Sequence, residues 1–200
     1  TKILETQLKL KEQELNYLKM QIHPHFLFNT LNTMYGFALK KADETPEMIL
    51  KLSNLLDYLL YQVDKPLVPL TDEINHIKDY ISLEHIRFND TLDVNLKDEH
   101  CSESIEIAPM LFLPFVENSF KHGKILGGKL AIDMLFKYEN NSIYFSIKNS
   151  HSKSVPSKTG IGLENIKKRL ELLYKNKYDL NIIESDTIFE VQLKLSLPNV

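Results

Sequence analysis

"KLAIDMLFKYENNSIYFSIKN", residues 129–149, decides the fold of the C-terminal half of this chain. Two runs of alternating apolar and polar residues flank ENN, a segment typical of a tight hairpin turn. In the second run Ile143, Phe145 and Ile147 share one face, because successive side chains of a strand point to opposite sides. The stretch predicts a β-hairpin with one buried face.

Strand and helix patterns alternate around this hairpin. TLDVNL (91–96) precedes it, and YDLNII (178–183) and TIFEVQLKLSL (187–197) follow it. A helix is expected after Pro109, ending at Gly123, and another over GIGLENIKKRLELLY (160–174). This order predicts an α+β fold: an α/β sandwich with a mixed, mostly antiparallel sheet and helices on one face.

The N-terminal segment carries a heptad pattern. The seam positions are spaced alternately by four and three residues: Leu4, Leu8, Lys11, Leu15, Leu18 and Ile22. This spacing is typical of a short coiled coil, although a single amphipathic helix packed on its own domain fits equally well. The chain starts inside this pattern without a methionine, so we expect it to be part of a longer protein.

A proline interrupts the pattern in QIHPHFLFNTLNT (21–33), where an interior helical proline costs about 3 kcal/mol. Beyond Pro24 the apolar stripe moves to the other side of the helix, where it comprises Leu27, Leu31, Met34 and Ala38, flanked by Phe28 and Tyr35. The former seam now carries His25, Asn29 and Asn32. We interpret Pro24 as the point where the buried face switches and His25 turns outward.

A second helix follows the turn KADETP (41–46), with Thr45 as N-cap and Pro46 at the first helical position. Its stripe is Ile49, Leu52, Leu56, Leu59 and Val63. Two helices joined by a short loop form an antiparallel hairpin, and its remaining apolar surface predicts dimerisation into a four-helix bundle. Thr71 is expected to cap a third helix that runs to about Phe88.

The pattern changes from helices to mixed strands and helices at about residue 91. We therefore assign residues 1–66 to coiled-coil and dimerisation helices, and residues 67–200 to a linker helix and the sandwich domain.

Composition excludes several classes of protein. A net charge of −3 and a pI near 6.2 give no general attraction to nucleic acid or anionic membrane. The single Cys101 forms no internal disulfide, which favours a reducing compartment. The chain shows no signal-peptide pattern and no apolar run near the roughly 18 residues of a membrane span.

Two polar groups could carry chemistry. Neutral imidazole is a nucleophile near neutral pH, so an exposed His25 beside a kink suits attack on an electrophile, whereas His23 is the expected bystander. In VENSFKHG (116–123) the side chains of Glu117, Asn118, Lys121 and His122 project from neighbouring positions of one helix. An amide oxygen suits Mg²⁺ and an ammonium group suits phosphate, although a solvated polar helix face is the alternative.

Glycines form a third candidate group. Gly160 and Gly162 stand just before a helix, where they allow the backbone to approach a phosphate. A plain helix-entry turn is the alternative interpretation.

The order of these segments is similar to that of a known family. QIHPHFLFNTLN, VPLTDEINHIKDYISLEHIRF, PMLFLPFVENSFKHG and TGIGLENIKKRLELLY together resemble the LytS/YehU-like sensor histidine kinases, from about residue 15 to the end. The last two segments resemble the Asn box and the Gly box of the GHKL ATPase fold. The resemblance implies a GHKL sandwich with ATP and Mg²⁺ as cofactors.

The resemblance also implies a role for each matching residue. His25 would accept the γ-phosphoryl group of ATP, and Asn118 would bind Mg²⁺. The phosphates would be lined by Lys121 and His122, and the ATP lid bordered by Gly160, Gly162 and Leu163. We count Glu117 and Asn29 with His25 as catalytic, and we expect Asn29 to hold a water for dephosphorylation of the response regulator.

The family further implies a homodimer that passes the phosphoryl group to an aspartate of a response regulator, usually of the LytTR DNA-binding type. Direct binding of nucleic acid is not expected. Membrane-spanning sensor segments upstream would hold this part on the cytoplasmic side of the bacterial inner membrane.

Two positions depart from the family pattern. His23 stands where Asn is common, so a second acceptor stays open. Asn149 stands where an Asp usually accepts the adenine amino group, and the glycine that should follow is absent. An Asn carbonyl can still accept from that amine while its NH₂ donates to a ring nitrogen. The alternative function is a non-catalytic dimeric scaffold that binds nucleotide; an ATP-driven clamp has no need of Pro24 and His25.

Overall fold

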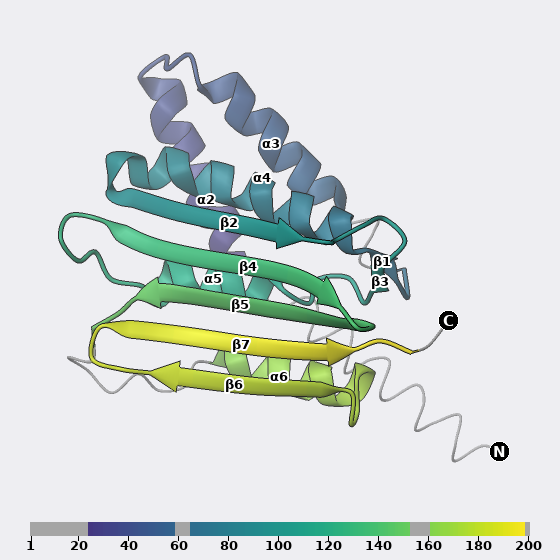
Figure 1. The fold of residues 1–200 in the computed structure, drawn as a ribbon. Coiled ribbons are helices and arrows are strands. Elements are labelled where there is room, and N and C mark those ends of the chain that lie inside the picture. The colour runs from purple at the N-terminus through teal and green to yellow at the C-terminus, as the bar shows by residue number, and fades with distance from the viewer. Residues whose placement is uncertain (1–23, 59–64, 153–160, 199–200) are drawn as a thin grey trace.

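A computed structural model describes residues 24–58, 65–152 and 161–198 of the chain. In these residues a five-stranded sheet has the order β2-β4-β5-β7-β6 (Figure 1). The first pair is parallel and the other three pairs are antiparallel. The strands are β2 (Leu92–Glu99), β4 (Leu130–Glu139), β5 (Ser142–Ser150), β6 (Tyr178–Glu184) and β7 (Ile188–Ser196). The predicted mixed, mostly antiparallel sheet is confirmed.

The hairpin of β4 and β5 has the predicted tight turn. Asn140 and Asn141 have φ of 50° and 55°, a left-handed backbone that Asn tolerates and that two-residue hairpin turns require. Across the hairpin Phe136 pairs with Phe145 on the buried face. The alternation in the sequence therefore specifies both the register and the inner face.

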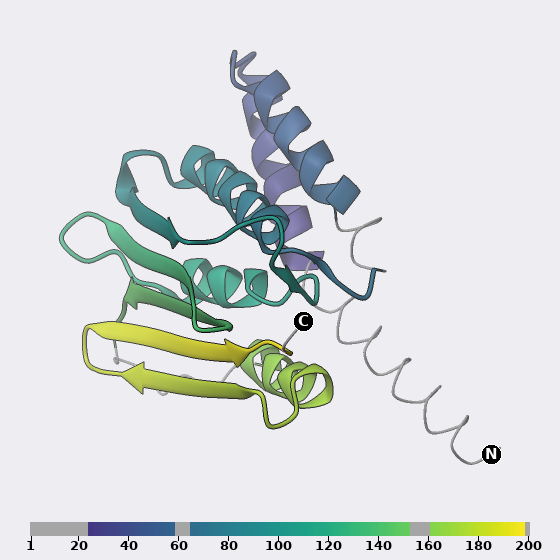
Figure 2. The ribbon, with the colours of Figure 1, turned by 45° about the vertical axis from the view of Figure 1, so that its right-hand side comes forward.

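Three helices cover one face of the sheet: α4 (Leu70–Phe88), α5 (Leu113–His122) and α6 (Ile161–Leu173) (Figures 1 and 2). Aromatic rings form the centre of the layer between them and the sheet. Phe112 has its ring centroid 5.1 Å from that of Phe136 and 4.9 Å from that of Phe145. The helices of the described residues leave the opposite face of the sheet open, as predicted.

The helix expected directly after Pro109 starts four residues later. Met110 has φ of 59°, and a left-handed residue cannot continue a right-handed helix. Residues 109–112 are instead a buried irregular segment. A short two-stranded sheet of β1 (Val68–Pro69) and β3 (Glu106–Ile107) lies beside it.

Two further helices, α2 (Pro24–Leu39) and α3 (Thr45–Asp57), form the predicted hairpin and pack against α4. The predicted caps are shifted: Glu44, not Thr45, stands at the N-cap of α3, and Thr71 lies inside α4, whose N-cap is Pro69. The 3₁₀ turn η2 (Asn89–Thr91) connects α4 to β2. None of the helices in the described residues is both long and apolar enough to span a membrane.

The buried stripe of α3 differs from the predicted one. Met48, Leu52 and Leu55 are buried, whereas Ile49, which we expected in the stripe, is 52% exposed. The reason is that α3 packs on α4 as well as on α2, which turns its buried face by one position. The predicted stripe positions Leu59 and Val63 lie outside the described residues.

The stripe of α2 is also rotated. Leu27, Met34 and Phe37 pack against the core and Thr30 is buried, but the expected Leu31 and Ala38 are exposed. The hairpin therefore keeps a second apolar surface exposed: Phe28, Leu31, Tyr35, Leu39, Ile49 and Leu50. We call these six residues the outer apolar face. The predicted heptad seam and His23 lie outside the described residues.

Candidate functional site

Asn149 is a polar residue at an apolar position. It continues the inward-facing series of β5 after Ile147 and is only 2% exposed. Its Nδ2 donates to the carbonyl oxygen of Ser150 at 3.0 Å, but its Oδ1 is buried without a hydrogen-bond partner among the described residues. Leaving a buried acceptor unpaired costs about 1–3 kcal/mol. One buried acceptor is thus left unpaired beside the end of α5.

The C-terminus of α5 reaches this asparagine at Gly123. A Cβ atom at Gly123 would lie 2.4 Å from the carbonyl oxygen of Ser119, 2.5 Å from Leu130 and 3.4 Å from Nδ2 of Asn149. Only glycine fits without displacement of its neighbours. Gly123 is therefore required for the close approach of α5 to β4 and β5.

Ser150 fixes the segment that leaves α5. Its carbonyl oxygen accepts from the N–H of Lys124 at 2.9 Å, and its Oγ donates to the carbonyl oxygen of Lys124 at 2.6 Å. The N–H of Ala131 donates to the same Oγ at 3.1 Å. Sequence reasoning missed Ser150 and Lys124, because these contacts arise only when β5 meets the start of β4.

The predicted polar residues of α5 differ in burial. Glu117 and Asn118 are half-buried, whereas Lys121 and His122 are exposed at the end of the helix. Partial burial, followed by the charges of Lys121, Lys124 and His151, lowers the pKa of His122. The ammonium groups of Lys121 and Lys124 near this imidazole suit a phosphate.

Glu117 lies on the side of α5 that faces α4. Burial raises the pKa of Glu84 on α4; Arg87 opposes this effect and the charge of Glu117 adds to it. Arg87 Nη2 lies 2.5 Å from Glu84 Oε2. Glu117 therefore lies near an ion pair between the buried Glu84 and the exposed Arg87, which sequence spacing did not predict.

The residues present fit an adenine nucleotide with Mg²⁺. The free Oδ1 of Asn149 matches an exocyclic amine. Asn118 supplies the kind of oxygen that Mg²⁺ accepts when phosphates and water complete its coordination. The Nδ2 of Asn149 is bonded to Ser150, so the expected additional contact with a ring nitrogen requires that this bond be exchanged.

The Gly box enters α6. Gly162 stands in the first turn of α6, and Leu163 is buried in the core, so it anchors the start of the helix. Gly160 lies outside the described residues. Helix α6 packs against α5, which brings the two motifs to neighbouring helices.

The acceptor motif lies on the hairpin. His25 is in the first turn of α2, and its side chain is outside the described part of the structure. Asn29 is half-buried and Asn32 is exposed, one and two turns further along. Helix α2 contacts both α3 and α4. The acceptor motif is thus connected through α4 to the domain that contains the five-stranded sheet.

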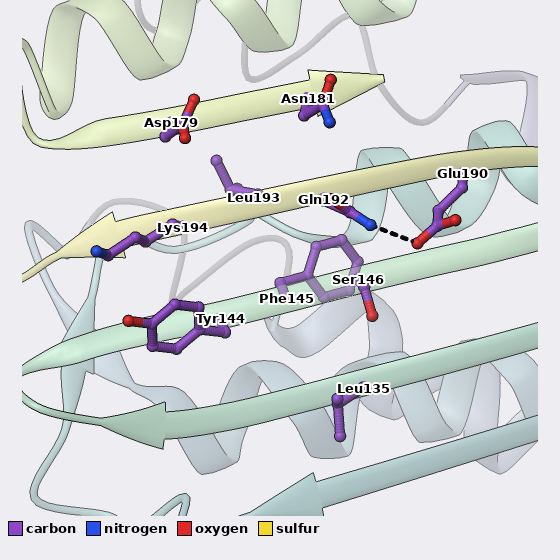
Figure 3. A pocket seen from close by; sticks show the side chains of 10 residues that line it. All are labelled: Leu135, Tyr144, Phe145, Ser146, Asp179, Asn181, Glu190, Gln192, Leu193 and Lys194. Atoms are coloured by element: carbon purple, nitrogen blue, oxygen red, sulfur yellow. Dashed lines mark hydrogen bonds between the residues drawn. The ribbon is translucent and has the colours of Figure 1, made fainter. Parts of the chain in front are cut away.

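A shallow hollow of about 380 Å³ lies elsewhere, on the open face of the sheet (Figure 3). It is lined by polar side chains such as Tyr144, Asp179 and Lys194, and by Gln192, which donates to Glu190 at 2.7 Å. The predicted site residues do not line it. The hollow is separate from the candidate site, which lies on the helix-covered side.

Solved structures show the same fold. The histidine kinase domain of the blue-light activated histidine kinase EL346 from Erythrobacter litoralis aligns with a TM-score of 0.51 at 13% identity, over 92% of this chain and 94% of that chain. A bacterial phosphotransferase aligns with a TM-score of 0.54 at 8% identity, over 90% of this chain and 96% of that chain. The fold is that of a histidine kinase domain, with its GHKL sandwich.

Comparison of sequences gives a more specific likeness than comparison of folds. A family model described as "Histidine kinase" matches residues 13–92. Sensor protein LytS of Bacillus subtilis (strain 168) is 30% identical over 188 residues, which cover 86% of this chain and 32% of the relative. Sensor histidine kinase BtsS of Escherichia coli (strain K12) is 28% identical over 192 residues, covering 93% and 34%. Over most of its length the chain is similar to LytS-like sensor histidine kinases, and it spans about a third of the length of these relatives.

Proposed function

We propose that this chain is the kinase part of a two-component sensor, which transfers the γ-phosphoryl group of ATP to His25 and then to an aspartate of a response regulator. The observation that best supports this proposal is the buried, unpaired Oδ1 of Asn149 beside Gly123. An adenine amino group can supply the missing donor. The family of the chain supports a histidine as acceptor.

Each residue of the lobe would have a separate task. Asn149 would bind the adenine amine, and Lys121 with His122 would hold the phosphates. Asn118 would hold Mg²⁺, which supplies charge neutralisation at the phosphates. Positioning and electrostatics provide most of the catalysis in phosphoryl transfer, so Phe26 in place of an acid beside His25 is compatible with activity.

The transfer itself requires a neutral imidazole. A ring nitrogen of His25 would form a bond to the γ-phosphorus while the bond to the β–γ bridging oxygen breaks and ADP leaves. The imidazole then loses its remaining ring proton to solvent or to a nearby base such as Glu117. We further propose that Asn29 holds the water that removes the phosphoryl group from the response regulator.

We propose a homodimer, because the outer apolar face has no partner within the described part of the chain. Burying it against a second hairpin would form the four-helix bundle. We divide the chain into dimerisation and phosphotransfer helices at 1–66 and a nucleotide lobe at 67–200. The pairing of β1 with β3 supports a lobe that starts before β1. A LytTR-type regulator and attachment to the cytoplasmic face of the membrane through upstream segments complete the proposal.

One observation favours the alternative, a scaffold that does not transfer phosphoryl groups. The Nδ2 of Asn149 is bonded to the chain itself, which leaves a single contact for adenine. Such a scaffold would show weak nucleotide binding and no transfer.

The decisive test uses labelled ATP and Mg²⁺ with the dimer. We expect acid-labile label that His25→Gln abolishes and His23→Gln retains. Label that persists in His25→Gln would contradict the assignment of the acceptor. Nucleotide binding without label in the parent protein would favour the scaffold.

A further inference from the structure

A buried polar cluster connects four elements of the molecule. Its members are Tyr58 at the end of α3, Glu73 in the first turn of α4, Arg169 and the α6-flanking Tyr174, together with the backbone of residues 108–111. Glu73 is 1% exposed and Arg169 is 3% exposed. Buried charges of this kind are stable only when they are paired and hydrogen-bonded.

Glu73 binds the segment before α5 through two backbone donors. The N–H of Met110 donates to Oε1 at 2.7 Å, and the N–H of Leu111 donates to Oε2 at 3.3 Å. The hydroxyl of Tyr58 also donates to Oε1. The carboxylate therefore joins α3, α4 and this segment at one point.

Arg169 and Tyr174 bind the same segment from the other side. Arg169 Nη1 donates to the carbonyl oxygen of Met110 at 2.5 Å, and Nη2 donates to that of Pro109. The N–H of Ala108 donates to the hydroxyl of Tyr174 at 2.9 Å. Glu73 of α4 therefore holds the N–H groups of residues 110 and 111, and Arg169 of α6 holds the carbonyl groups of residues 109 and 110. Tyr174, just after α6, holds the N–H of Ala108.

The residue at the centre is strained. Met110 has φ of 59°, a region that a non-glycine residue adopts at a cost and keeps only when its surroundings enforce it. Glu73 and Arg169 bind its N–H and its carbonyl oxygen. Helix α5 begins three residues later, so this geometry sets the direction of the helix that carries Asn118 and His122.

Tyr58 is the member of the cluster that belongs to the hairpin of α2 and α3. Its ring lies on that of His76 of α4, with centroids 3.6 Å apart. Its hydroxyl reaches the carboxylate that also holds the start of α5. Tyr58 thus links the end of α3 to residues 109–112, the segment that leads into α5 and its predicted nucleotide-binding residues.

We propose that Tyr58 and Glu73 are positioning residues that hold the histidine-bearing hairpin in a fixed orientation to the nucleotide lobe. The catalytic part of this inference rests on the proposed function. Tyr58 fixes the hairpin, whereas Tyr174 and Arg169 fix only the lobe. Loss of the Tyr58 hydroxyl should therefore separate transfer from nucleotide binding.

Three tyrosine variants test this separation. Tyr58→Phe retains the ring but removes the bond to Glu73. We expect ATP affinity and KM to stay unchanged while autophosphorylation turnover falls about tenfold, the equivalent of one hydrogen bond. Tyr178→Phe is the matched control, because it removes an exposed tyrosine–glutamate bond of 3.3 Å to Glu171. Tyr174→Phe should instead raise KM, since it frees the N–H of Ala108 in the lobe.

A distance measurement tests the orientation of the hairpin relative to the lobe and does not depend on phosphoryl transfer. Spin labels at Ser53→Cys on α3 and Asp179→Cys on β6, both exposed, are placed in a Cys101→Ser background and diluted with unlabelled chain. We expect the distance distribution to broaden in Tyr58→Phe and to stay narrow in Tyr178→Phe. An unchanged distribution in Tyr58→Phe, or equal broadening in both variants, would overturn the proposal. Broadening confined to Tyr58→Phe in a protein that transfers no phosphoryl group would retain the structural link and refute the proposed function.

Discussion

The Nδ2 atom of Asn149 lies 3.4 Å from the position that a Cβ atom on Gly123 would occupy. The two residues come from β5 and from the end of α5, 26 residues apart in sequence (149 − 123). Their contact places the buried acceptor of the sheet against the helix that carries Asn118. The candidate site depends on this contact.

Gly123→Ala should weaken that contact. Its Cβ would clash with Ser119 and Leu130, so we expect a loss of about 1–3 kcal/mol in the free energy of unfolding, typical of overpacking. Urea denaturation measures this loss. Gly36→Ala is the control, because nothing lies within 4 Å of a Cβ in the interior of α2. That variant should stabilise the protein by about 1 kcal/mol; equal effects of the two substitutions would contradict the steric argument.

Asn149→Leu tests the unpaired acceptor. Removal of Oδ1 should lower ATP affinity about tenfold or more, in proportion to one buried hydrogen bond, and leave folding stability unchanged or higher. Calorimetric titration with a non-hydrolysable ATP analogue measures the affinity. Asn95→Leu on the exposed face of β2 is the matched control. Unchanged affinity in Asn149→Leu would show that adenine binds elsewhere.

The burial of Glu73 should make the free energy of unfolding depend on pH. Burial raises its pKa above the ordinary 4.5, although Tyr58, Met110, Arg169 and Leu111 oppose this effect. The folded state then binds more protons than the unfolded state above pH 4.5, so the contribution of Glu73 to stability is complete below that value and is lost as the pH rises. The difference in unfolding free energy between wild type and Glu73→Gln should therefore fall with rising pH, by at most about 1.4 kcal/mol per unit.

If the difference for Glu73→Gln grew with pH instead, the hydrogen bonds and Arg169 would outweigh burial. The pKa of Glu73 would then be lower in the folded state than in the unfolded state, the opposite of our expectation.

Because the outer apolar face is exposed, we expect the protein to form a homodimer through it. Phe28 is 65% exposed and Tyr35 is 67% exposed on α2. Replacing both with Glu should weaken the dimer about a hundredfold or more, because several apolar side chains lose their burial in each interface. Sedimentation equilibrium measures the association. Ile183→Glu, an exposed apolar position on β6, should leave the dimer intact; a monomeric parent protein would contradict the four-helix bundle.

Local patterns predicted the sheet well, because side-chain alternation and turn residues are local properties. Ile143, Phe145 and Ile147 lie on the buried face as expected, and the two asparagines make the turn. Asn149 could be recognised as a polar residue that continues the same inward series. These features require only the sequence of one hairpin.

Features that depend on distant partners escaped prediction. The stripe of α3 shifted because α4 forms a second packing surface, and α5 began late because Glu73 and Arg169 hold Met110 in a left-handed conformation. Glu73 and Arg169 are 96 residues apart (169 − 73), so no local pattern connects them. The motifs predicted the residues of the site but not the structure that positions them.

The central claim is that the lobe transfers a phosphoryl group to one particular imidazole. After incubation with ATP and Mg²⁺, fragmentation mass spectrometry of the peptide that contains both His23 and His25 locates the modification directly. The account predicts a phosphoryl group on His25, absent in Asn118→Ala, which lacks the proposed Mg²⁺ ligand, and reduced in Asn149→Leu, which binds ATP more weakly. A phosphoryl group on His23 with His25 unmodified, or an unmodified peptide from a protein that binds ATP, would contradict it.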